Sequence, residues 1–262
     1  EVAPIAGNDL VLTLDRSIQY QLNQSLYSRV RQVNARGGTA IVMNSKTGDI
    51  YAMANVRRNE DGTYSNSGNY GAVEAHETGS TAKVFSIAAA INEGAVSPDS
   101  VFHVPGAQQF DKYLIRDAYP HPTQAMPVRE ILVKSSNLGT VLTAQRITSS
   151  TLESYLHAFG FGDKTALDFP DESAGILKPV SKWRGTEKIT VAYGYGFAST
   201  SLQLISAVNV VANNGTYVAP RMVSGTIDKS GKLRTTEPSS TRPVLTQTTA
   251  TQMNLMMRDV VC

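Results

Sequence analysis

Three patterns in the sequence predict a mixed fold of the α/β class (α+β type), in which helices flank an antiparallel sheet. Segment 9–15 alternates as a strand does, and a helical pattern follows it directly. Two apolar, β-prone runs, 39–45 and 49–56, are joined by a short segment that ends in Gly48, which predicts an antiparallel hairpin. Runs of small and apolar residues around 84–91 and 201–213 predict buried helices.

The first third of the chain is predicted to hold a helix, the hairpin, a loop and a second helix. The first helix is indicated by apolar residues at the spacing of one helical face, namely Ile18, Leu22, Leu26, Val30 and Val33. The hairpin turn is expected at 46–48. Residues 57–73 are polar and glycine-rich, which favours an exposed loop over a packed element. A buried helix should then begin near Ser80 and end at Gly94.

The remaining chain alternates helices with short connections. In order, the patterns predict a helix over 128–147 that is interrupted at 135–137, a helix from Thr151, a Gly/Pro/Asp-rich connection over 160–180, a helix over 201–215, a second hairpin over 216–234 and a helical segment over 246–262. The final segment stops without a capping residue or a polar tail.

Composition excludes several functions rather than indicating one. The net charge of +2, from 24 basic and 22 acidic residues, gives no field that would attract nucleic acid or acidic lipid. The only cysteine, Cys262, can form no disulfide within the chain and no cysteine-based metal site. The histidines show no pair at metal-ligand spacing, and no run of about 18 apolar residues is present. We therefore expect one domain with no cofactor, no metal and no nucleic-acid partner.

The sequence Ser80-Thr81-Ala82-Lys83 could supply a nucleophile and its base. Residues three apart on a helix share a face, so the Lys83 amine would lie near the Ser80 hydroxyl. Apolar surroundings disfavour the charged form of Lys83, which makes the amine a better proton acceptor. The free N–H groups at the start of the helix would suit a developing oxyanion. Taken alone, the pattern more often marks a capping serine and a solvated lysine.

A second candidate element is "KSSNLG", residues 134–139. The break between two predicted helices would present the side chains of Ser135 and Asn137 toward a common cleft. Serine and asparagine between helices are usually caps. Ser-x-x-Lys, a Ser-x-Asn element and Lys-Thr-Gly together, however, form the signature set of penicillin-recognising serine enzymes.

Six segments match the transpeptidase domain of class B penicillin-binding proteins, and they occur in the order of that family. They are "DLVLTLDRSIQYQL", "GGTAIVMNSKTGDIYAMA", "GSTAKVFSIAAAI", "KSSNLG", "FGFGDKTALDFPDESAGILKP" and "YGYGFASTSLQLISAVNVVANNG". The chain from about Asp9 to Cys262 therefore resembles this domain of the peptidoglycan D,D-transpeptidases. The resemblance implies the penicillin-binding-protein/serine β-lactamase fold, with an antiparallel sheet, flanking helices, a helical lobe, and an active site in the groove between sheet and lobe.

The third triplet of the signature set is not found where the resemblance places it. Residues 46–48 read Lys-Thr-Gly, but they belong to the early hairpin, so we interpret them as structural. Residues 229–231 read Lys-Ser-Gly and are interpreted as a hairpin turn. No other such triplet follows Asn137. We therefore expect residues 1–262 to be a transpeptidase domain that is incomplete at its C-terminus, with an N-terminal membrane anchor and a pedestal domain outside this chain.

The resemblance implies acyl transfer between peptidoglycan stem peptides, with covalent inhibition by β-lactams. Ser80 would be the nucleophile and Lys83 its base. Ser135 would relay a proton to the leaving group, and Asn137 would hydrogen-bond the substrate amide. Ser80, Ser135 and Asn137 would together bind the substrate. The family also implies action at the extracytoplasmic face of the bacterial membrane, beside a membrane glycan polymerase.

Two other functions are compatible with the sequence. One is a D,D-carboxypeptidase or β-lactamase, in which water accepts the acyl group. Glu172 is the residue that most resembles a deacylating base, but its surroundings favour a structural or surface role. The other is a domain of the same fold that senses β-lactams or scaffolds division proteins without catalysis. At one position the chain departs from the family, since Thr78 stands where the family has proline. His76 is assigned no role.

Overall fold

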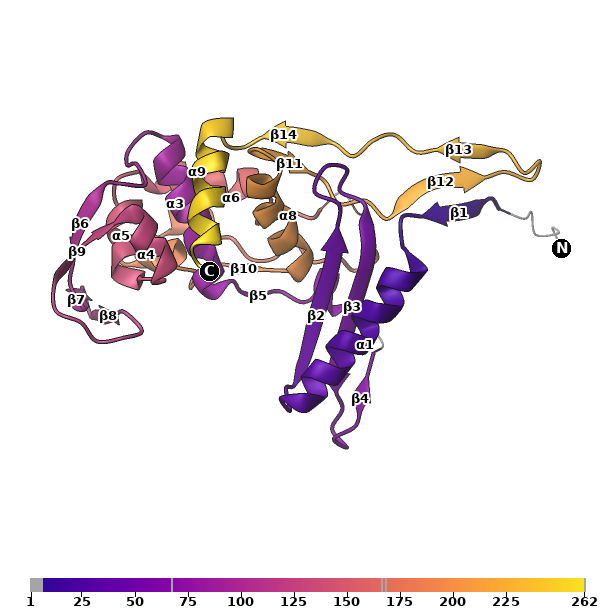
Figure 1. Cartoon of the computed structure of the whole chain (residues 1–262), viewed down its shortest axis with the longest axis horizontal. Coiled ribbons are helices and arrows are strands. Elements are labelled where there is room, and N and C mark those ends of the chain that lie inside the picture. The colour runs from indigo at the N-terminus through magenta and orange to yellow at the C-terminus, as the bar shows by residue number, and fades with distance from the viewer. Residues whose placement is uncertain (1–6, 67, 166, 168, 262) are drawn as a thin grey trace.

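The computed structural model of the chain describes residues 7–66, 68–165, 167 and 169–261. A helical lobe, a sheet with one long helix beside it and a projecting strand ribbon make up the molecule (Figure 1). The helices are α1 (Arg16–Gln32), α2 (Tyr70–Val73), α3 (Ala82–Asn92), α4 (Val128–Val133), α5 (Asn137–Ala144), α6 (Ser149–Phe159), α7 (Glu187–Ala192), α8 (Ser201–Ala212) and α9 (Gln247–Arg258), with 3₁₀ turns at Gly79–Thr81 and Val180–Lys182. The strands are β1 (Asp9–Leu12), β2 (Gly37–Met43), β3 (Ile50–Arg58), β4 (Tyr64–Ser65), β5 (His76–Glu77), β6 (Val101–Val104), β7 (Ala107–Phe110), β8 (Tyr113–Arg116), β9 (Gln124–Pro127), β10 (Ala198–Ser199), β11 (Thr216–Val218), β12 (Val223–Ile227), β13 (Leu233–Thr235) and β14 (Thr241–Pro243).

The named strands all pair antiparallel, as the sequence predicted. The largest paired unit is β2-β3-β4, and a second three-stranded unit runs β1-β12-β13. The other described pairs are β5-β10, β6-β9, β7-β8 and β11-β14. Within the described residues the antiparallel sheet therefore consists of short, separate units.

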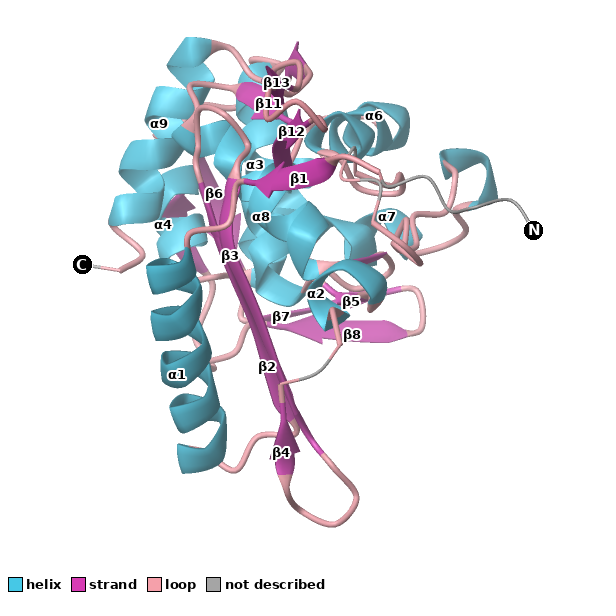
Figure 2. Ribbon diagram, turned by 90° about the vertical axis from the view of Figure 1, so that its right-hand side faces the viewer, coloured by secondary structure: helices cyan, strands magenta, loops and turns pink. Residues whose placement is uncertain are grey.

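Helix α1 lies along the β2-β3 hairpin, as Figures 1 and 2 show from two sides. Its N-cap is Asp15, whose carboxylate accepts hydrogen bonds from the N–H groups of Ser17 and Ile18. Alternate positions of β2 face different helices. Gly38 lies against Leu26 and Val30 of α1, whereas its neighbour Thr39 faces α2. The hairpin is therefore a layer between α1 and the rest of the chain.

The hairpin turn confirms the structural interpretation of residues 46–48. The side chain of Asn44 accepts hydrogen bonds from the N–H groups of Lys46 and Thr47, which is an Asx turn. Gly48 has φ +74°, and a Cβ there would lie 2.1 Å from the carbonyl oxygen of Ala219. This glycine is therefore required by both backbone conformation and close approach.

The helical lobe is built around α3, which is buried along most of its length. Phe85 of α3 packs against Phe159 and Phe161, with ring centroids 4.9 and 5.0 Å apart. Phe159 ends α6, and helices α5 and α9 also contact α3. Because α3 is fixed on all sides, the residues at its first turn are held rigidly with respect to the lobe.

The prediction that 57–73 is an unpacked loop is wrong. Strand β4 extends the hairpin, and the one-turn helix α2 buries Gly71 and Ala72. Asn55 of β3 accepts a hydrogen bond of 2.9 Å from the Gly71 N–H. Small residues in a polar stretch carry little hydrophobic signal, so this packing is invisible in the sequence pattern.

The prediction that 216–234 forms one hairpin is wrong in its first half. Strand β11 pairs with β14, and the hairpin is β12-β13. Pro220 lies between β11 and β12, lacks an N–H group and ends the apolar run. Residues 229–231 lie in the β12-β13 turn, which confirms their interpretation as a turn.

Candidate active site

Ser80 lies in the 3₁₀ turn that leads from β5 into α3, and its side chain is exposed. The segment after α7 holds this turn in place, because the Gly194 carbonyl accepts a hydrogen bond of 3.1 Å from the Gly79 N–H. Gly194 has φ +97°, and a Cβ on it would lie 1.8 Å from the Gly79 carbonyl oxygen. The prediction that the helix starts near Ser80 is confirmed, with the α-helix itself beginning at Ala82.

Lys83 lies three residues further along, with a side chain that is almost fully buried (1% exposed). Its Nζ donates hydrogen bonds to the carbonyl oxygen (2.5 Å) and to the Oγ (2.9 Å) of Ser135. Burial lowers the pKa of Lys83 to about 8, and the negative charge of Asp117 opposes this by raising it. The amine therefore loses its proton far more readily than an exposed lysine does.

Ser135 occupies the break between α4 and α5 in the left-handed conformation, with φ +52°. Its N–H donates to the carbonyl of Leu132, and the Ser136 N–H donates to the carbonyl of Ile131, so the end of α4 is closed by backbone bonds. Ser136 then caps α5, accepting a hydrogen bond of 2.8 Å from the Gly139 N–H. The predicted interruption is confirmed, and it turns both the carbonyl and the hydroxyl of Ser135 toward Lys83.

The common cleft expected for Ser135 and Asn137 stays a prediction. The Asn137 Nδ2 donates a hydrogen bond of 2.7 Å to the carbonyl oxygen of Arg116, at the end of β8, whereas Ser135 faces Lys83. The two side chains thus have different hydrogen-bond partners. Within the described residues, no hydrogen bond joins Ser80 to Lys83. The structure thus joins Lys83 and Ser135 directly. Ser80 lies three residues before Lys83, and Asn137 lies two residues after Ser135.

The site contains two further residues that the sequence did not single out, Asp117 and Ser136. Asp117 accepts hydrogen bonds from the Ser136 hydroxyl (2.5 Å) and the Leu138 N–H (2.9 Å). Ser136 could have been found, because a serine before an apolar helical run is a common N-cap. Asp117 follows a short strand and is 19 residues away from Ser136, and no local pattern indicates that contact.

Glu172 is buried, and its Oε1 accepts hydrogen bonds from the N–H (2.7 Å) and the hydroxyl (2.5 Å) of Thr165. This geometry agrees with the structural role that the sequence favoured. Neither Thr165 nor Glu172 contacts Ser80, Lys83 or Ser135 among the hydrogen bonds of the described residues.

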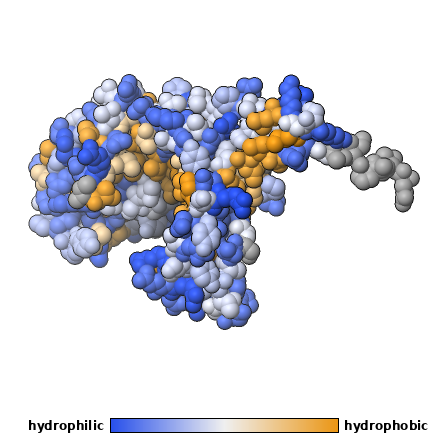
Figure 3. Space-filling model, turned by 45° about the vertical axis from the view of Figure 1, so that its right-hand side comes forward, coloured by the Kyte–Doolittle hydropathy of each residue, from blue (hydrophilic) through white to orange (hydrophobic). Residues whose placement is uncertain are grey.

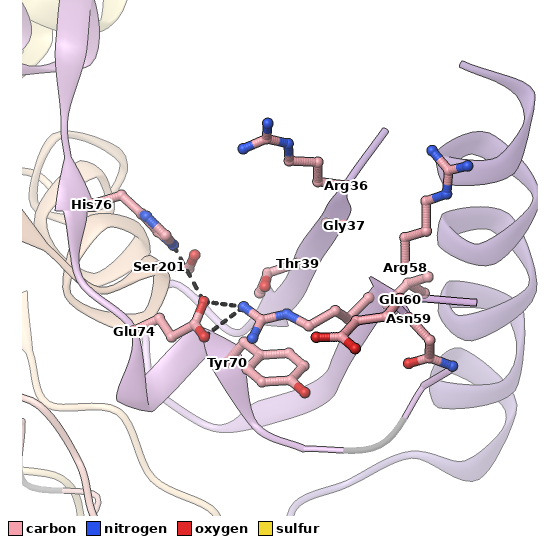
Figure 4. A pocket seen from close by; sticks show the side chains of 13 residues that line it. Arg36, Gly37, Thr39, Arg58, Asn59, Glu60, Tyr70, Glu74, His76 and Ser201 are labelled. Carbon is pink, nitrogen blue, oxygen red and sulfur yellow. Dashed lines mark hydrogen bonds and ion pairs between the residues drawn. The ribbon is translucent and has the colours of Figure 1, made fainter. Parts of the chain in front are cut away.

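A groove of about 770 Å³ lies away from Ser80, between the hairpin, α2 and β5 (Figure 4). The Arg57 guanidinium pairs with Glu74 at 2.5 Å and stacks 3.8 Å from the ring centroid of Tyr70. His76 lies 3.6 Å from the same carboxylate and is exposed. Among the described residues, Arg36, Arg58 and Glu60 of this groove take part in no ion pair, and none of the four predicted site residues lines it.

The described residues hold neither a candidate metal site nor a candidate membrane-spanning helix. No cluster of three or more His, Cys, Asp or Glu side chains has the geometry of a metal site. No helix among them combines the length and apolar composition needed to cross a bilayer.

Comparisons with known proteins identify the family. Residues 38–262 match the model of the penicillin-binding protein transpeptidase domain. The chain is 32% identical to the penicillin-binding protein PbpB of Mycolicibacterium smegmatis, over 98% of this chain and 41% of that protein. It is 30% identical to a probable peptidoglycan D,D-transpeptidase, PenA of Neisseria flavescens, over 87% of this chain and 58% of that protein.

A solved structure has the same fold. Penicillin-binding protein 3 of Mycobacterium tuberculosis, in complex with aztreonam, superposes with a TM-score of 0.92 at 30% identity, over 98% of this chain and 58% of that one. The chain therefore spans about two fifths to three fifths of the length of these relatives. The resemblance seen in the sequence is thus confirmed, and the chain belongs to the transpeptidase-domain family of the penicillin-binding proteins.

Proposed function

We propose that the full-length protein containing this chain is a serine acyltransferase that cross-links peptidoglycan stem peptides and is acylated by β-lactams. One observation carries the proposal. A buried lysine with a pKa near 8 is held by Ser135, three residues after an exposed serine at the start of the same helix. The relatives include a protein named as a probable peptidoglycan D,D-transpeptidase, which supports the substrate class.

The hydrogen bonds of Lys83 suit it to act as a base. A neutral amine has two N–H groups and one lone pair, and the carbonyl and hydroxyl of Ser135 accept from two N–H groups. The lone pair is then left free for the proton of Ser80. The same contact lets Ser135 take a proton from Lys83 while passing its own hydroxyl proton onward.

The proposed reaction has two steps. Ser80 Oγ attacks the penultimate D-alanine carbonyl of one stem peptide and gives its proton to Lys83. The bond to the terminal D-alanine nitrogen breaks, and that nitrogen receives a proton from Lys83 through Ser135. In the second step the amine of another stem peptide attacks the ester and loses a proton to Lys83, and Lys83 gives a proton back to Ser80 Oγ as the ester bond breaks. Asn137 would orient the substrate amide, with the second N–H of its Nδ2 still available.

A donor peptide that ends in D-Ala-D-Ala, mixed with an amine acceptor, tests the proposal in the full-length protein. We expect release of D-alanine together with the amide product, and loss of both in Ser80→Ala. A hydrolysed acid as the main product would instead indicate a carboxypeptidase. Absence of both products, in a protein that binds penicillin without forming a bond, would favour the sensor or scaffold function.

The remaining expectations concern the setting of the reaction. We propose action at the extracytoplasmic face of the bacterial membrane, because peptidoglycan stem peptides are found there, with a membrane glycan polymerase as the partner. An anchor and a pedestal domain outside this chain remain part of the proposal. Cell fractionation and co-purification of the full-length protein test these points, and recovery in the cytoplasm alone would contradict them.

A further inference from the structure

The carboxylate of Asp117 lies just after β8 and makes three contacts with other residues. Its side chain is only 7% exposed. Its Oδ2 accepts a hydrogen bond of 2.5 Å from the Ser136 hydroxyl and lies 3.1 Å from Nε2 of His121. Its Oδ1 accepts a hydrogen bond of 2.9 Å from the N–H of Leu138. One carboxylate is thus bound to the residue after Ser135 and to the first turn of α5.

Arg116, the last residue of β8, makes a fourth contact with the same segment. The Arg116 carbonyl accepts a hydrogen bond of 2.7 Å from the Asn137 side chain. Three consecutive residues, Ser136, Asn137 and Leu138, are therefore fastened to the end of β8. The loop that presents Ser135 has its position set by this strand end.

Ser135 needs such support because of its backbone conformation. A non-glycine residue at φ +52° is strained, and such residues persist only where the surroundings hold them. In this conformation both the carbonyl and the hydroxyl of Ser135 meet the Lys83 amine. Relaxation of the loop would break this double contact.

We propose that Asp117 is a positioning residue for acyl transfer, which fastens Ser136 and the start of α5 and so holds Ser135 against Lys83. The proposal rests on the function proposed above, because it assigns a role within the same reaction. Asp117 touches none of Ser80, Lys83 or the predicted substrate-binding atoms in the described hydrogen bonds. It acts through Ser136 rather than on the substrate.

Asp117 also acts on Lys83 through its charge, which gives the role a separate signature. Its field raises the pKa of Lys83 against the larger lowering caused by burial. The other ionisable groups around this carboxylate are His121, which contacts it, and Lys134, whose charge acts on His121. Loss of the Asp117 charge should therefore lower the pKa of Lys83 further.

Acylation of the full-length protein by a fluorescent penicillin tests the proposal with Asp117→Asn. We expect the acylation rate constant to fall by about 10- to 100-fold, because misplaced groups react slowly, with a smaller change in noncovalent affinity. The rise of the rate with pH should also move to lower pH. Ser136→Ala should lower the rate without moving the pH dependence. Asp111→Asn, the same change at the tip of the β7-β8 hairpin, should match the wild type.

Three results would overturn the proposal. The first is Asp117→Asn with the wild-type rate and the wild-type pH dependence. The second is a fall that comes only from fewer active molecules, with an unchanged rate for those that remain, because that marks a purely structural residue. The third is a wild-type protein that is not acylated at Ser80, which is visible before any variant is made and refutes the proposed function itself.

Discussion

At the scale of single residues, Lys83 and Glu172 are the two charged residues that are buried as whole residues in the part of the chain that the structure describes. Thr165 binds one oxygen of Glu172, and the other oxygen has no partner among the described residues. Lys83 has instead two acceptors on a strained serine. The lysine is thus placed at a cost in stability, which is typical of a functional group.

Lys83→Met should stabilise the protein at neutral pH while abolishing acylation. Burial that lowers the pKa from 10.5 to about 8 costs on the order of 3 kcal/mol in the charged state, at about 1.4 kcal/mol per unit. Below pH 8 this cost is fully present, because folded and unfolded chains are both protonated. Between about 8 and 10.5 the unfolded chain binds more protons, so wild-type stability rises with pH and the advantage of the variant shrinks.

Denaturant unfolding at several pH values measures this difference. The exposed lysine Lys182 gives the control, because Lys182→Met should change stability by less than about 0.5 kcal/mol at any pH. A Lys83→Met variant that is less stable than wild type at pH 7 would show that its contacts with Ser135 outweigh the cost of burial.

At the scale of secondary-structure elements, the position of Ser80 depends on two backbones that touch. The 3₁₀ turn before α3 rests on the segment after α7, through Gly79 and Gly194. Just before this turn, Thr78 has φ −66°, which proline would also adopt. The buried hydroxyl of Thr78 has no hydrogen-bond partner among the described residues.

Gly194→Ala should displace the 3₁₀ turn and lower acylation at Ser80. Its Cβ would lie 1.8 Å from the Gly79 carbonyl oxygen, in addition to the strain at φ +97°. Gly185→Ala is the matched control, since Gly185 also has positive φ (+53°) but has nothing within 4 Å of its Cβ position. In Gly185→Ala the free energy of unfolding should fall by only about 1–2 kcal/mol. In Gly194→Ala it should fall further, and most of the acylation rate should be lost. Equal effects in the two variants would show that the contact does not position Ser80.

Thr78→Pro should stabilise the protein by roughly 0.5–1 kcal/mol in thermal or denaturant unfolding, because it restricts the unfolded chain at a compatible φ. It also removes a buried hydroxyl that has no described partner. As a contrast, Thr190→Pro in α7 should destabilise, because it removes the hydrogen bond from the Thr190 N–H to the Thr186 carbonyl. Destabilisation by Thr78→Pro would mean that the Thr78 N–H or hydroxyl has a role that φ does not reveal.

The sequence predicted those elements whose signals are local. The amphipathic spacing of α1, the apolar run of α3 and the break at Ser135 all follow from residues within a few positions of one another. The contacts of Asp117 with Ser136, and of Gly79 with Gly194, join residues far apart in the chain. Such contacts depend on packing, and local patterns do not contain them.

At the scale of the whole molecule, the ribbon β1-β12-β13 projects from the body and exposes apolar side chains (Figure 3). Leu10 pairs across the sheet with Thr226, and Leu233 pairs with Ile227. Thr226 and Ile227 are consecutive in β12, so their side chains point to opposite faces of the ribbon. Leu10 and Leu233, which pair with them, therefore also lie on opposite faces. They are 64% and 54% exposed, and a narrow ribbon with both faces open is marginally stable alone.

The 262-residue chain should therefore self-associate through this ribbon, because exposed apolar surface on short strands favours association. Leu10→Lys combined with Leu233→Lys should reduce the associated fraction in analytical ultracentrifugation. Leu255→Lys is the control, since Leu255 of α9 is similarly exposed (55%) but lies outside the ribbon. An equal reduction by the control would place the association elsewhere.

The proposed nucleophile of the penicillin-recognising site is Ser80. The most direct measurement is the intact mass of the full-length protein with and without benzylpenicillin, followed by mapping of the modified peptide. This assignment predicts an increment of one penicillin on the peptide that contains Ser80, and no increment in Ser80→Ala. An unmodified wild type, or an adduct that persists in Ser80→Ala, would contradict it.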